Sequence, residues 1–388
     1  MKRRTFLQLV AATIGLGLSA CGPASPEVEV RLLEGSIPAR LIKRFKRQSQ
    51  ASATFTATPS LLSLFQDLRR WQRLPGEAVP RWQRIWNWVR FWQSESSPGN
   101  APDWVSLGDY WLTAAVQEQL IQPLRSEHLP GWQRLSPAWQ QLVRRDRNGQ
   151  FAEDGAIWAV PYRWGSLIWI YDPRPFQRLG WQPSQWQDLW HPDLQRRFAL
   201  PDHPRLVLGL ALKALNQSAN SPDVQAMAAL SERLQTLQQQ VQLYSSEHGL
   251  KALINGDLWL IVGWSTDLLP QLSQYRQFQA GIPQEGTILT ADLWVRPTNA
   301  PLPLSAAAKQ WIEFCLTPDH AAQLSLLSQG GSPLYAGQQR QALPSNLQEQ
   351  PLIFPPADLY GRSEFLQPLS DSAQTAYDRL WQEMRSPG

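Results

Sequence analysis

Alternating blocks of apolar and polar residues predict a chain body in which strands and helices take turns. Apolar and charged residues alternate from Val28 to Leu33, which is the period of a half-buried strand. After Pro38, the residues Leu41, Ile42 and Phe45 fall on one face of a helix. The same reasoning predicts further strands at 103–107, 157–162, 167–171, 198–200, 259–262 and 289–295, and helices at 206–215, 224–243, 305–316 and 319–328. Strands that alternate with helices indicate an α/β fold class.

The first twenty-one residues follow another pattern, in which cations precede a short apolar run and a cysteine. The apolar run at 9–17 is shorter than the ~20 residues that a helix needs to cross ~30 Å of hydrocarbon, so residues 1–20 are predicted to be a signal peptide. The string RRTFL resembles a twin-arginine export signal, and LSAC resembles the bacterial lipobox, in which Cys21 receives the lipid. We therefore expect an exported periplasmic protein that is tethered to a membrane through the Cys21 lipid, with residues 21–27 as the tether. An ordinary buried helix with an incidental cysteine is the weaker alternative, because it would not begin with three cations.

Composition limits the classes of partner. The chain has 388 residues, of which 43% are hydrophobic, enough for packed cores in about two domains. The formal net charge is +4, but Lys2, Arg3 and Arg4 leave with the signal peptide. The nearly neutral remainder lacks the many cations that binding to nucleic-acid phosphates requires, so we expect no nucleic-acid partner.

The chain contains two cysteines, Cys21 and Cys315. A lipidated Cys21 leaves Cys315 without a partner for a disulfide. Apolar residues recur at helical spacing around Cys315, so we expect a buried structural thiol rather than a nucleophile.

The segment at 69–93 interrupts the alternation of strands and helices with a concentration of Trp and Arg. One face of a helix here would carry Trp82, Ile85, Trp86, Val89 and Trp92. Such a face is typical of a helix that lies on a bilayer, but apolar helical stripes usually pack against the protein body, which we favour. A third use of Trp and Arg, stacking on single-stranded nucleic acid, does not suit a protein outside the cytoplasm.

The residue patterns of common catalytic sites are missing. None of the five histidines has the spacing of a zinc site, and no Gly-rich run precedes Lys-Ser or Lys-Thr. The GWST string at 263–266 lacks the second glycine of a nucleophile elbow. We therefore predict no catalytic residues, no metal and no cofactor, and we interpret the chain as a binding protein.

Several short strings occur in the order that one known family shows. They are GSIP at 35–38, DWVSLGDY at 103–110, VPYRWG at 160–165, WQDLWHP at 186–192, INGD at 254–257, GW at 263–264 and FCLTPD at 314–319. In this order the chain resembles the periplasmic solute-binding proteins of ABC importers, and in particular their spermidine/putrescine-binding branch, over roughly 28–333.

This resemblance implies a two-lobed α/β fold of the periplasmic-binding-protein type II class, with a ligand cleft between lobes that close by bending. Trp164 and Gly165 are the expected hinge, because glycine removes the side-chain restriction on φ and ψ. Lobe 1 is expected to comprise 28–164 and 289–340, with 69–93 as an insertion, and lobe 2 to comprise 165–288 and 341–388. The partners implied are a small-molecule solute and an inner-membrane ABC permease, with the protein itself a monomer.

Three residues match the family's polyamine-binding pattern. Tyr110 stands where the family has a cleft tyrosine, Trp264 where it has a stacking tryptophan, and Asp292 where it has an amine-binding aspartate. Such a site combines aromatic walls for alkyl chains and cation–π contact with carboxylates for the ammonium ends. Trp264 could equally be a core residue that caps a strand end, and Asp292, between apolar neighbours, is expected to be buried and paired.

The loop after the strand at 198–200 departs from the family, because His203 and Leu206 occupy its two acidic ligand positions. Asp202 aligns beside the first of them, and Asp109 and Glu34 could supply carboxylates from other directions. The ligand set expected from the sequence is therefore Tyr110, Trp264, Asp292, Asp109, Glu34, Asp202 and His203. The solute predicted is putrescine, spermidine or a related small amine.

Two other functions stay open from the sequence. An envelope scaffold or sensor could retain the two-lobed fold without binding a polyamine, with 69–93 as its partner surface. An exported enzyme with a bound cofactor would explain the twin-arginine signal, but it lacks a cofactor motif.

Overall fold

The computed structural model describes residues 27–72 and 101–386. The predicted signal peptide, Cys21, nearly all of the tether and most of the 69–93 insertion lie outside these residues. In the described ranges, no helix has both the length and the apolar character needed to cross a membrane.

One ten-stranded sheet organises the described part of the chain. Its main path runs β2 (Ala53–Thr58), β1 (Val28–Leu33), β3 (Trp104–Gly108), β11 (Ile288–Val295), β6 (Val160–Tyr171), β9 (Leu260–Trp264), β7 (Phe198–Leu200) and β8 (Leu243–Tyr244). Off this path, β10 (Gln279–Gly281) pairs with β6 and β12 (Glu364–Phe365) pairs with β11, while β4 (Arg144–Arg145) and β5 (Ala156–Ile157) form a separate ribbon. The mixture of strands and helices is the α/β class that the sequence predicts.

Helices cover the sheet in two groups. The N-terminal helices are α1 (Ala39–Ser49), α2 (Leu61–Gln72), α4 (Leu112–Gln117), α5 (Pro137–Leu142) and α6 (Pro173–Leu179). The central ones are α7 (Pro204–Ala214), α8 (Ala228–Gln240), α9 (Gly249–Asn255) and α10 (Ser265–Leu272). The last are α11 (Ala306–Cys315), α12 (Pro318–Ser328), α13 (Ala357–Gly361) and α14 (Asp371–Arg385).

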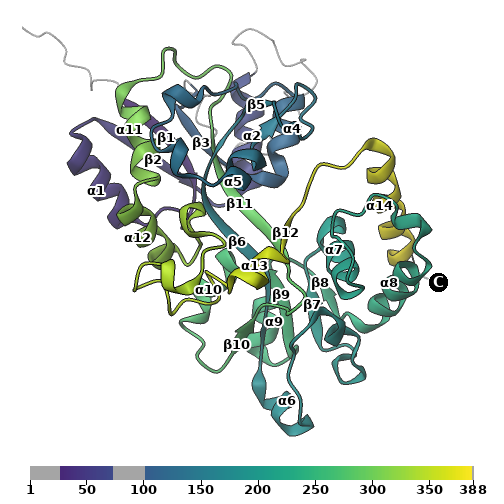
Figure 1. Ribbon diagram of the computed structural model, residues 1–388. Helices are drawn as coiled ribbons and strands as arrows, with labels where there is room; N and C mark the ends of the chain where they lie inside the picture. The colour runs from purple at the N-terminus through teal and green to yellow at the C-terminus, as the bar shows by residue number, and fades with distance from the viewer. Residues whose placement is uncertain (1–26, 73–100, 387–388) are drawn as a thin grey trace, which may run out of the picture.

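Two apolar cores divide the molecule. One surrounds Trp104 and Trp311, where β1, β2 and β3 pack against α1, α2 and α11. The other surrounds Trp169 and Trp186, where α7, α8 and α14 pack together beside β7 and β9. Figure 1 shows β6 and β11 running through the centre of the molecule between these two groups. The predicted lobe boundaries stay a prediction, although α14 joins the second core while Leu343 and Phe354 join the first.

The sequence predicts two strands separated at Arg163-Trp164-Gly165, and that prediction is wrong. The structure has a single strand, β6, in which all twelve residues are buried. Strand β11 pairs with its first half and β9 with its second, so the backbone between the two halves stays hydrogen-bonded. The expected hinge residues, Trp164 and Gly165, therefore lie within a strand that both halves share.

Gly165 also has a different reason from the one predicted. It lies opposite Thr290 in the ladder, and a Cβ at this position would come within 2.8 Å of both Ser265 Oγ and Thr266 Cγ2. Close approach of the first turn of α10, rather than freedom of φ and ψ, is what glycine provides here.

Cys315 lies on α11 and is 4% exposed, as the sequence predicts for a structural thiol. Burial raises the pKa of this thiol, so it stays protonated and unreactive at neutral pH.

Candidate functional site

The predicted site residues follow the carboxyl ends of strands from both halves, where open α/β sheets bind their ligands. Asp109 and Tyr110 follow β3 of the first half, and His203 follows β7 of the second. The rings of Tyr110 and His203 meet edge to face, with centroids 4.8 Å apart. The structure thus brings together two of the predicted residues across the boundary between the halves.

His203 is an uncharged wall at this contact. Burial lowers the pKa of its imidazole, and the Arg205 guanidinium lowers it further. Arg205 is itself buried and stacks over the Tyr377 ring at 4.6 Å. At neutral pH the imidazole is therefore neutral and supplies no charge to a ligand.

Asp292 is buried and paired, as the sequence predicts. Its Oδ2 accepts a hydrogen bond of 2.6 Å from Arg163 Nε, with the two residues only 7% and 3% exposed. They lie directly opposite each other in the β6–β11 ladder, next to a bulge. The carboxylate that the resemblance assigns to an amine is therefore already neutralised by a side chain of this protein.

The sequence analysis missed Arg163, although it lies inside a quoted string, VPYRWG. An arginine between apolar neighbours of a buried strand needs a countercharge, and this was the available signal. Burial disfavours its charged form, but Asp292 and Tyr162 outweigh burial and raise the pKa of Arg163.

Asp267 is a second residue that the sequence analysis missed. It lies in the first turn of α10 and remains open to solvent in a recess close to Arg163 and Asp292. Desolvation raises the pKa of its carboxyl, Arg163 lowers it in part, and Asp292 raises it again. No family motif marks this position, so only the fold reveals it.

Trp264 ends β9 and is half-buried. Together with Asp267 it lines a cavity of about 120 Å³ at the carboxyl ends of the neighbouring strands β7, β8 and β9. The indole therefore reaches a cavity and is not sealed in either core.

Asp109 connects the end of β3 to β11. Its Oδ1 accepts hydrogen bonds from Thr290 Oγ1 at 2.8 Å and from Ala291 N at 3.1 Å. Burial raises the pKa of this carboxyl to about 6, despite both hydrogen bonds. Asp109 thus positions the loop that carries Tyr110.

Glu34 and Asp202 lie apart from this cluster. Glu34 is exposed in the turn after β1, and exposed Asp202 lies 3.7 Å from Arg385 of α14. In residues 27–72 and 101–386, no hydrogen bond or ion pair joins either carboxylate to Tyr110 or Trp264. Their proposed contact with the solute stays a prediction.

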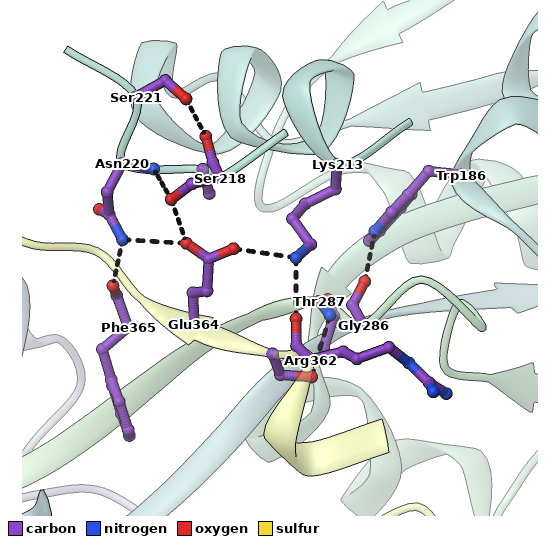
Figure 2. A network of polar contacts seen from close by, with 12 residues as sticks. Trp186, Lys213, Ser218, Asn220, Ser221, Gly286, Thr287, Arg362, Glu364 and Phe365 are labelled. Atoms are coloured by element: carbon purple, nitrogen blue, oxygen red, sulfur yellow. Dashed lines mark hydrogen bonds and ion pairs between the residues drawn. The ribbon is translucent and has the colours of Figure 1, made fainter. Parts of the chain in front are cut away.

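A larger cavity of about 630 Å³ also lies between the two groups of elements, but none of the predicted ligand residues lines it. Its carboxylate, Glu364, is held by neighbours, as Figure 2 shows: Lys213 Nζ donates to Oε1 at 2.9 Å, and Ser218 Oγ and Asn220 Nδ2 donate to Oε2. Burial opposes the charge of Glu364, but Ser218 and Lys213 outweigh it and lower its pKa. This network fastens β12 to α7 and leaves little polar capacity for a ligand.

Comparison with known proteins decides the family. Residues 101–359 match the family described as bacterial extracellular solute-binding protein. The chain belongs to this family. Its members bind solutes and are not enzymes.

Individual relatives agree with this assignment. The chain is 24% identical over 284 residues to a spermidine/putrescine-binding periplasmic protein 1 of Haemophilus influenzae, covering 73% of this chain and 75% of that one. It is 24% identical over 294 residues to the putrescine-binding periplasmic protein PotF of Escherichia coli K12, covering 71% and 75%.

A solved structure confirms the fold. The spermidine/putrescine ABC transporter substrate-binding protein PotD of Streptococcus pneumoniae superposes with a TM-score of 0.73 at 19% identity, covering 93% of this chain and 99% of that one. The fold is therefore the two-lobed type II periplasmic-binding-protein fold that the sequence predicts.

The buried ion pair gives a stability prediction. Asp292→Asn should lower the free energy of unfolding by about 3–5 kcal/mol, because it leaves the Arg163 guanidinium buried without a countercharge. The measurement is urea unfolding followed by circular dichroism. The double variant Arg163→Met/Asp292→Leu removes both charges and should recover most of the loss.

The matched control is the exposed Arg379–Glu383 pair of α14, whose N–O distance is 2.7 Å. Because both side chains are solvated, Glu383→Gln should cost about 0.2–1 kcal/mol. Equal losses for Asp292→Asn and Glu383→Gln would contradict the burial argument.

Asp109 gives a prediction for pH. A folded-state pKa of about 6, above the ordinary value of 3.8, means that stability is greatest below pH 4 and is lost as the pH rises through 6. Asp109→Asn retains an oxygen for both hydrogen bonds, so at pH 8 it should be more stable than the wild type, by up to about 3 kcal/mol. Thermal unfolding from pH 4 to pH 8 measures this, and parallel pH profiles for the two proteins would refute it.

Proposed function

We propose that this protein is the lipid-anchored substrate-binding component of an ABC importer for a small amine of the polyamine type, such as putrescine or spermidine. The relatives named above bind these amines. The observation that carries the proposal is the contact between Tyr110 and His203, because it joins predicted ligand residues from the two halves. A solute held there would touch both halves at once.

The chemistry of the surrounding side chains supports a cationic solute. Trp264 offers an aromatic face for cation–π contact. Asp267 and Asp109 remain when Arg163 and Asp292 are counted as a neutral pair. The region therefore retains negative charge for an ammonium group.

Export and anchoring follow from the first twenty-one residues. The relatives are named as periplasmic proteins, and a lipid on Cys21 would keep this protein at the membrane that holds its permease. Tethering raises the effective concentration of the receptor at the permease. Closure of the lobes over the solute would give the permease a surface that the empty receptor lacks.

The scaffold or sensor alternative is not favoured, because the matched relatives are named for the solutes that they bind. The 69–93 insertion remains its only specific support from the sequence.

Solute binding is tested with purified residues 22–388. Calorimetric titration with putrescine and spermidine should give saturable heat at micromolar protein. Trp264→Leu should weaken the affinity about tenfold, because a partly desolvated cation–π contact contributes about 1–2 kcal/mol. The absence of heat with both amines would remove the polyamine proposal.

Closure is tested on the same material. Small-angle scattering should show a smaller radius of gyration with saturating solute than without it, because hinge closure makes the particle more compact. An unchanged radius with a solute that binds would contradict closure.

Anchoring is tested in cells. Cys21→Ser should move the protein from the membrane fraction to the soluble periplasmic fraction, because the acceptor of the lipid is gone. Cys315→Ser is the matched control, since it removes the other cysteine of the chain and should leave the protein with the membrane. If Cys21→Ser stays membrane-bound, the lipid anchor is wrong.

A further inference from the structure

The ion pair of Arg163 and Asp292 raises the question of which carboxylate receives the ammonium group. Arg163 Nε already occupies Asp292 Oδ2, and both side chains are buried. An ammonium group could displace this arginine only by leaving a guanidinium buried without a partner, which is strongly unfavourable. The receiving carboxylate must therefore be another one.

The recess at the carboxyl ends of β7, β8 and β9 has the composition of a cation site. It measures about 120 Å³ and is lined by Trp264 and by two carboxylates, Asp267 and Glu247. Among the described residues that line it, none is a lysine, arginine or histidine. The floor is apolar, with Leu250, Ile261 and Leu268 among its members.

Each wall suits one part of a primary alkylammonium ion. The indole of Trp264 can face the charge, the carboxylates can accept its N–H groups, and the apolar floor can take the first methylenes. Asp267 is held in place by its position in the first turn of α10, where the helix dipole favours a negative side chain. The volume suits one end of a solute, with the remainder extending toward the cleft.

We propose that Trp264, Asp267 and Glu247 form the subsite for a terminal ammonium group, and that Asp267 takes the role the resemblance assigns to Asp292. This inference rests on the proposed function, since it names the ammonium-binding residues of that same receptor. Asp292 then serves to hold Arg163, and through it the joint between β6 and β11.

The test compares putrescine binding to the wild type, Asp267→Asn and Glu247→Gln by calorimetry. Asp267→Asn should weaken binding about tenfold or more, and Glu247→Gln by a smaller factor, because each removes a charge-assisted hydrogen bond. Asp319→Asn is the matched control. It removes a carboxylate from the first turn of another helix, α12, and should leave the affinity unchanged.

A second readout separates this inference from the proposed function. The indole NMR signal of Trp264, assigned with Trp264→Phe, should shift when butylammonium is added but not when butanol is added. The shift should disappear in Asp267→Asn. This experiment needs no polyamine binding, so it tests the subsite even if putrescine and spermidine give no heat.

Two results would overturn the subsite. One is a Trp264 signal that ignores butylammonium in the wild type. The other is an Asp267→Asn variant with wild-type putrescine affinity together with an Arg163→Gln variant of raised affinity, since that pair of results would make Asp292 the receiving carboxylate.

Discussion

The pairing of β6 with β11 is the constraint on which the rest of the structure depends. These two strands run antiparallel through both halves, and every feature of the candidate site is referred to their register. Arg163 faces Asp292 because the ladder places them opposite each other, and Asp109 anchors its loop on Thr290 and Ala291 of β11. Gly165 lets the first turn of α10 approach the ladder, which positions Asp267 and Trp264.

The charges around this ladder are arranged in two ways. Glu364 and Asp292 are committed, the first to Lys213, Ser218 and Asn220 and the second to Arg163. Asp267 is open to solvent in a recess with an aromatic wall. Committed carboxylates hold elements together, whereas a carboxylate that keeps its solvent access is available to a ligand. Burial and partners, rather than residue type, separate the two roles.

The sequence predicted the fold class, the order of most elements and the buried states of Cys315 and Asp292, because periodicity and local apolar context determine these features. It failed at residues 163–165, where an arginine and a glycine suggested a break. Long-range pairing with β11 overrides that local signal, and no local pattern reports such pairing. For the same reason the partner of Asp292 and the recess beside Asp267 were missed: both depend on which distant strands become neighbours.

The continuity of β6 has a mechanical consequence. All twelve of its residues are buried, and it is hydrogen-bonded to β11 on the way out of one half and to β9 on the way into the other. Such a ribbon has no free joint at which to swivel. Any relative movement of the halves must be an elastic flexure spread over several residues of both strands, with the bulge beside Asp292 as the most compliant point. Stiffness of this ribbon, and not only affinity for a guest, would then set how much of the empty protein rests in a compact shape.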